Sequence, residues 1–74
     1  MTITGNQLLL LRTLRKISQH GLARSLSISQ QYLSKLENLG EEKVPHYWSQ
    51  KIIKTLNCSK TELNIITGIT PSRN

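Results

Sequence analysis

One 19-residue segment, Ser18–Leu36, constrains the fold of this 74-residue chain more than any other feature. Ser18 and Ser29 each precede a stretch in which apolar residues recur three or four positions apart. A serine oxygen in that place can accept from the free amides of a helix's first turn, so the segment predicts two short helices. Only Ser27 and Ile28 separate them, which forces a sharp crossing with Ile28 at the corner.

The outward face of the second of these helices carries Gln30, Gln31, Ser34 and Lys35. Glutamine can bond adenine through two hydrogen bonds, and lysine can donate to the acceptors of guanine. Two glutamines on an exposed helix could also be an ordinary solvated face. Their place directly after the Ser29 cap favours contact with base edges, because the first residues of such a helix come closest to the base pairs.

From Leu8 to Leu63 the chain resembles the helix-turn-helix domain of lambda repressor and Cro, often called Xre-like. The resemblance rests on an ordered set of residues and not on any single one. The set comprises Leu8, Leu11, Arg12, Ser18, Gln19, Leu22, Ala23, Ile28, Ser29, residues 32–38, Ile52, Leu56, residues 57–59, Glu62 and Leu63. It implies an all-α fold, a compact five-helix bundle that binds operator DNA, commonly as a homodimer.

The remaining pattern agrees with five helices and no strand, at residues 5–16, 19–26, 30–38, 45–56 and from a capping box at Ser59–Glu62 to Gly68. A first capping box is expected at Thr4–Gln7, Pro45 should lie in the first turn of the fourth helix, and Asn57 should be a left-handed C-cap. One DNA-binding domain therefore spans residues 1–68, followed by a tail at 69–74.

Periodicity assigns a core in which aliphatic residues dominate. It comprises Leu8, Leu11, Ile17, Leu22, Ala23, Leu26, Ile28, Leu33, Leu36, Trp48, Ile52, Leu56 and Leu63. Arg12 and Glu37 border these stripes, and a buried charge is tolerable only when it is paired. The resemblance implies that they pair with each other and orient the third helix. The alternative is two solvated surface charges.

Candidate phosphate contacts flank the base-contacting helix. Gln19 begins the second helix, where free amides favour an anion, and the resemblance implies that it bonds a phosphate and braces Gln30. The other candidates are Arg24, Tyr32, Asn38 and Lys43. The ring of Tyr32 could pack under the turn, or its hydroxyl could reach a phosphate. The loop departs from the family pattern, since Leu39 is inserted and Glu41 and Glu42 stand where basic residues are usual.

Two further departures concern backbone conformation. Ser27 occupies a turn position that prefers positive φ and is typically glycine, at a modest cost in strain. Gly21 lies inside the second helix, where it costs about 1 kcal/mol relative to alanine. Both indicate a marginally stable domain.

Composition favours a polyanionic partner and does not favour an enzyme. Ten Lys and Arg against four Asp and Glu give a net charge of +6. Cys58 stands alone and is expected in the core, while His20 and His46 share no ligand spacing. We expect no enzyme activity, metal or cofactor, and neither a membrane span nor a secretion signal, hence a cytoplasmic, nucleoid-associated protein.

These patterns favour a small bacterial or phage transcriptional regulator of the repressor type. Ile65, Ile66 and Ile69 predict a homodimer interface that would place two recognition helices ~34 Å apart, the alternative being simple packing within the bundle. The rival function is a protein-interaction module, antitoxin-like or an adaptor, that binds a protein such as a toxin through the fifth helix. A phage switch, an antitoxin and a restriction-modification controller share this plan.

Overall fold

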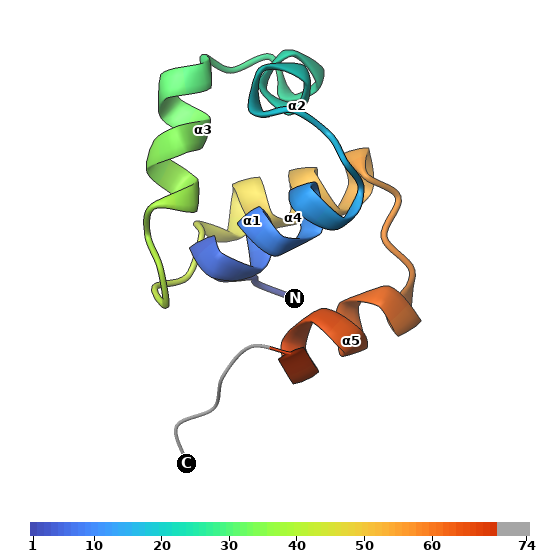
Figure 1. The fold of residues 1–74 in the computed structure, drawn as a ribbon. Helices are drawn as coiled ribbons and strands as arrows, with labels where there is room; N and C mark the ends of the chain where they lie inside the picture. The colour runs from blue at the N-terminus through green and yellow to red at the C-terminus, as the bar shows by residue number, and fades with distance from the viewer. Residues whose placement is uncertain (70–74) are drawn as a thin grey trace.

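The computed structural model describes residues 1–69 and shows an all-α bundle (Figure 1). Its helices are α1 (Gly5–Leu14), α2 (Gln19–Leu26), α3 (Gln30–Glu37), α4 (His46–Thr55) and α5 (Lys60–Ile69). Helix α2 packs against α3 and α4, and α1 packs against α3 and α5. The five-helix prediction is confirmed for this part of the chain. Residues 70–74, most of the expected tail, lie outside the described residues.

The helix starts follow the predicted caps. Thr4 Oγ1 accepts from the amide of Gln7 at 3.1 Å, and Gln7 Oε1 accepts from the amide of Thr4 at 2.9 Å, which completes the first capping box. Ser59 caps α5 through the amide of Glu62 at 3.0 Å. The carboxylate of Glu62 is engaged both with Arg15 and with the backbone amide of Ser59, and the contact with Ser59 is the reciprocal bond of the predicted second capping box.

Several helix ends differ from the predictions. Helix α1 ends at Leu14, two residues early, because Lys16 adopts φ 56° and turns the chain toward α2. Pro45 is the N-cap of α4 and not a residue of its first turn. Gly68 does not stop α5, which continues to Ile69. Asn57 does adopt the expected left-handed conformation, with φ 54°.

The core contains nine of the thirteen predicted residues as buried side chains, and Ile17, Ile28 and Trp48 pack against it partly buried. Leu63 is only half-buried, and Ile66 takes the inward position of α5. The prediction that Ile66 contributes to a dimer interface is therefore wrong, since a side chain with 0% exposure has no surface to offer a second chain. Ile3 and Val44 are core residues that periodicity missed.

The first residues of the chain are tied to the loop between α3 and α4. Val44 N–H donates to Ile3 O at 2.8 Å, and Asn6 N–H donates to Gly40 O at 2.9 Å. The buried hydroxyl of Ser49 accepts from Ile3 N–H at 3.2 Å and donates to Val44 O at 3.1 Å. These bonds hold the irregular loop after α3 against the start of α1, so the backbone of the loop is fixed at the C-terminal end of α3.

Gly5 permits the close approach at this point. A Cβ at Gly5 would lie 2.7 Å from Leu36 O, 2.8 Å from Gly40 N and 2.9 Å from Glu37 O, all of them backbone atoms. Backbone cannot move aside as the end of a long side chain can. Glycine is therefore required where α1 begins, and its role is steric.

We expect Gly5→Ala to destabilise the domain by about 2 kcal/mol, because the added methyl group forces the start of α1 away from the end of α3. Urea unfolding followed by circular dichroism measures this change. Gly68→Ala is the matched control, since nothing lies within 4 Å of a Cβ there and α5 should gain up to ~1 kcal/mol from alanine. Equal stability of the two variants would contradict the steric account.

Helix α5 is attached to α1 by an ion pair. Arg15 Nη2 lies 2.5 Å and Nε 2.9 Å from the carboxylate oxygens of Glu62, and Arg15 Nη1 donates to Leu56 O at 2.6 Å. The hydrogen bond from Arg15 lowers the pKa of Glu62 below its ordinary value, against an opposing effect of burial.

Within residues 1–69 no helix is long and apolar enough to cross a membrane.

The pair of Arg15 and Glu62 makes stability depend on pH. A carboxyl group whose pKa is lowered by folding stabilises the fold above its unfolded pKa, and the contribution disappears as the pH falls through the folded value. Glu62→Gln should cost about 1 kcal/mol at pH 7. The difference from wild type should vanish well below pH ~4, where the carboxyl group is protonated in both states. Urea unfolding from pH 7 to pH 3 measures the difference in unfolding free energy between Glu62→Gln and wild type, and a difference that stays constant would contradict this account. Glu41→Gln, in the exposed loop, is the control and should show little difference at any pH.

Candidate nucleic-acid interface

Helices α2 and α3 are connected by the predicted tight turn. Ser18 Oγ accepts from the amide of Gly21 at 2.9 Å, and Ser29 Oγ accepts from the amide of Tyr32 at 3.0 Å. Ser27 adopts φ 60° and ψ 40°, the left-handed conformation expected for this position. Ile28 N–H donates back to Ala23 O at 3.0 Å, so the chain enters α3 immediately after leaving α2.

A line of polar side chains connects the interior to the first residue of α3. Arg12 Nε lies 2.5 Å from Glu37 Oε2, and the two side chains are only 16% and 5% exposed. Gln19 Nε2 donates to Glu37 Oε1 at 3.0 Å, and Gln30 Nε2 donates to Gln19 Oε1 at 3.1 Å. We call Arg12, Glu37, Gln19 and Gln30 the polar chain. It contains the predicted ion pair and the predicted brace from Gln19 to Gln30.

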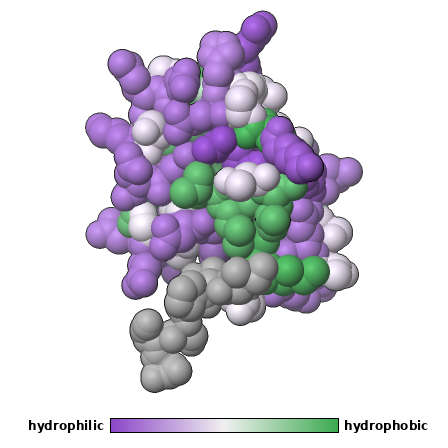
Figure 2. Space-filling model, in the orientation of Figure 1, coloured by the Kyte–Doolittle hydropathy of each residue, from purple (hydrophilic) through white to green (hydrophobic). Residues whose placement is uncertain are grey.

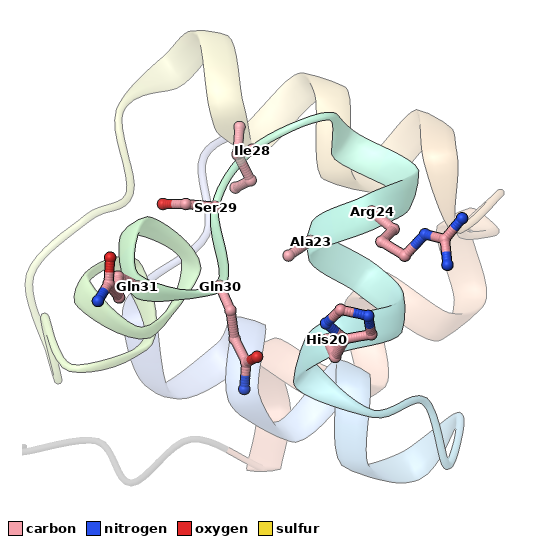
Figure 3. A pocket seen from close by; sticks show the side chains of 7 residues that line it. All are labelled: His20, Ala23, Arg24, Ile28, Ser29, Gln30 and Gln31. Carbon is pink, nitrogen blue, oxygen red and sulfur yellow. The ribbon is translucent and has the colours of Figure 1, made fainter.

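The outer face of α3 lies opposite the buried Leu33 and Leu36. Gln30, Gln31 and Lys35 are exposed on it, and Ser34 is half-buried. Figure 3 shows Gln30 directed toward the space beside α2, with Gln31 on the far side of α3. The structure therefore leaves these polar ends accessible to a ligand that lies along α3.

A hollow of about 460 Å³ opens between α2 and the start of α3 (Figure 3). Ala23 and Ile28 contribute apolar surface, and the residues around it are His20, Arg24, Ser29, Gln30 and Gln31. Sequence reasoning did not include His20 in the site. The spacing of His20 and Arg24 could have identified it, because residues four apart on a helix lie on the same face.

The other predicted phosphate contacts are distributed over the two ends of α3. Arg24 lies beside the hollow, while Asn38 caps the far end of α3 and Lys43 is held in the loop by a bridge to Thr4. Tyr32 packs its ring against Trp48 of α4 in an edge arrangement, with ring centroids 5.8 Å apart, and keeps 36% of its surface exposed.

Metal-binding side chains do not cluster in the part of the chain that the structure describes. No three histidine, cysteine or acidic residues lie close enough together to hold a metal ion within residues 1–69. Cys58 is half-buried, and burial raises the pKa of its thiol. The thiol is therefore protonated at neutral pH, which agrees with a packing role.

Comparison with protein families identifies the segment that carries this geometry. Residues 8–42 match the model of the helix-turn-helix family, from α1 to the loop after α3. This segment is a Cro/C1-type helix-turn-helix. The family is one of DNA-binding regulators, so the helix-turn-helix supports DNA binding as the general function of this domain. Comparison with curated proteins and with solved structures found no match.

The polar chain leads to a prediction for the helix-turn-helix. Glu37→Gln keeps the shape of the side chain but leaves the guanidinium of Arg12 without a counter-charge in a largely buried position. We expect a loss of about 3 kcal/mol, measured as a lower urea midpoint with an unchanged slope. Glu42→Gln, an exposed glutamate in the loop, should change stability by less than ~0.5 kcal/mol. A similar loss in both variants would mean that the pair has no special role.

Proposed function

We propose that the protein is a sequence-specific regulator of transcription, of the small bacterial or phage repressor type, which places α3 in the major groove of an operator. The observation that carries the proposal is the orientation of Gln30. Its Nε2 donates one hydrogen to Gln19, which leaves its second hydrogen and its carbonyl oxygen for a base. That donor and acceptor pair matches the N7 and N6 positions of adenine.

Gln31, Ser34 and Lys35 extend the base-contacting face along α3. A helix that enters the major groove presents its N-terminal residues to the base edges, so the two glutamines are the principal candidates for specificity. Lys35 lies one turn further on, where it could donate to guanine or to a phosphate. Ser34 is small enough to leave room for the groove wall.

Backbone contacts would position this face. Gln19 begins α2, where amide groups and the helix dipole favour a phosphate, and Arg24 extends the positive surface along the same helix. At the far end of α3 the candidates are Asn38 and Lys43. The neighbouring Glu41 and Glu42 are exposed, which argues for a weaker phosphate contact at that end. Tyr32 could add its hydroxyl.

We further propose a homodimer through the apolar surface formed by α1 and α5. Leu14 is 55% exposed and Ile65 is 54% exposed. They lie near the same ion pair, because Leu14 precedes Arg15 and Ile65 is one turn after Glu62. Figure 2 shows hydrophobic residues gathered around these two helices. The side chain of Ile69 lies outside what the structure describes. A protein partner such as a toxin could use the same surface, which keeps the interaction module as the second candidate.

Selection of bound sequences from a random duplex pool near physiological salt tests the proposal. A dimeric regulator should enrich a near-palindromic motif with half-sites one helical turn apart, about 34 Å. The best duplex should bind at least a thousandfold more tightly than scrambled DNA. Weak binding that disappears with salt and enriches no motif would overturn the proposal and favour a protein partner.

The double variant Gln30→Ala, Gln31→Ala should lose the preference for the selected duplex while keeping salt-dependent binding to any DNA. Each good base contact is worth about 1–3 kcal/mol, so the preference should fall by a factor of ten or more. Fluorescence anisotropy with selected and scrambled duplexes measures the effect. Asn64→Ala on α5 is the control and should retain the preference. If the double variant retained it too, α3 would not be the recognition helix.

A further inference from the structure

A second hollow, of about 540 Å³, runs along the outer face of α4. It is lined by His46, Tyr47, Gln50, Lys51, Lys54 and Thr55, and we call it the α4 groove. We propose that the α4 groove binds phosphates of the DNA backbone that flank the base pairs contacted by α3. The inference rests on the proposed function and extends it to a surface that the helix-turn-helix itself does not include.

Tyr47 and Lys51 form a pair of donors in this groove. Tyr47 is 62% exposed, and Lys51 Nζ lies 3.5 Å from its hydroxyl oxygen and 5.7 Å from the centre of its ring. The hydroxyl accepts from the ammonium group and therefore keeps its own hydrogen for donation. A phosphate placed beside both groups can accept from the hydroxyl and from the ammonium group together.

The positive charge of the groove favours binding of an anion. Lys51 and Lys54 are three residues apart on one helix, and neither forms an ion pair within residues 1–69. No carboxylate lines the groove. Two neighbouring ammonium groups repel each other, and a bound phosphate would replace that repulsion by attraction to both.

Two other polar residues of the groove, His46 and Gln50, are engaged with the first residues of the chain. His46 Nδ1 lies 3.4 Å from Thr2 Oγ1, and Gln50 donates to the carbonyl oxygen of Met1. The first residues of the chain thus border one side of the groove. Tyr47, Lys51 and Lys54, together with the hydroxyl of Thr55, remain to face a ligand.

Continuity with α3 favours DNA over an acidic protein segment. Trp48 contacts Tyr32 of α3 with ring centroids 5.8 Å apart, and it contacts Tyr47 with centroids 5.0 Å apart. This row of three aromatic rings connects the first turn of α3 to the groove. A duplex held by α3 therefore has phosphates close at hand for the groove, whereas an acidic peptide would need an attachment of its own.

The test compares the double variant Lys51→Gln, Lys54→Gln with wild type on the selected and the scrambled duplex over a range of salt concentrations. We expect both duplexes to bind roughly tenfold more weakly, because phosphate contacts carry no sequence information. The negative slope of log affinity against log salt should become shallower by about 2, close to one for each phosphate that the variant no longer neutralises. Tyr47→Phe, which removes only the hydroxyl, should lower the affinity for both duplexes a few-fold. Lys60→Gln on α5 is the control and should stay within about twofold of wild type.

The length of the duplex separates the possible results. Trimming the base pairs that flank the selected motif should remove the difference between the double variant and wild type. If affinity and salt slope are unchanged on every duplex while wild type keeps its operator preference, the α4 groove does not bind DNA and the proposed function stands. Binding of a poly-glutamate peptide that is abolished in the double variant, with DNA binding unchanged, would overturn the proposal in favour of an acidic protein segment. A wild-type protein without any operator preference would overturn the proposed function itself.

Discussion

The ion pair between Arg12 and Glu37 is the interaction on which the rest of the structure depends. It joins the last turn of α1 to the end of α3, and Arg12 Nη1 also donates to Ile17 O at 2.9 Å, at the entrance to α2. Three helices therefore meet at one guanidinium group. Buried ion pairs contribute little net stability compared with apolar packing, but they favour one relative arrangement of the elements that carry them.

That arrangement determines what α3 can present to a ligand. Glu37 uses its second oxygen to hold Gln19, and Gln19 holds Gln30 in turn. A long amide side chain on a surface normally occupies many rotamers, and ordering it on binding costs conformational entropy. In this protein Gln30, the first residue of α3, is already held by hydrogen bonds before any ligand arrives, because its position is tied to a group that is largely buried.

Much of the helix-turn-helix could be predicted from the sequence because its determinants are local. Ser18, Ser29 and the left-handed Ser27 each act within a few residues of themselves, so a linear pattern contains them. The pair of Arg12 and Glu37 has no such local signal. It was predictable only through the resemblance to a family, together with the rule that a buried charge needs a partner.

The features that the sequence did not predict depend on contacts between distant residues. Arg15 and Glu62 are 47 positions apart, and nothing near either residue indicates its partner. Ile3 and Val44 lie outside any helix, so helical periodicity cannot mark them. On α5, Leu63 and Ile66 are both one or two turns from the cap, and the way in which α5 docks on α1 decides which of them is buried. Three aromatic rings in a row likewise require the fold to bring Tyr32 to Trp48.

The hydrogen bonds between residues 3–6 and residues 40–44 have a consequence for how the domain folds. They close a loop of chain that contains both helices of the helix-turn-helix, and such a closure requires a loss of chain entropy before its contacts are gained. The capped helices α2 and α3 can form early, since their determinants are local. Their final orientation has to wait until the two ends of this loop meet. The surface that would contact DNA is thus assembled by residues at the margins of the motif, and the order of assembly makes that surface one of the last features of the domain to form.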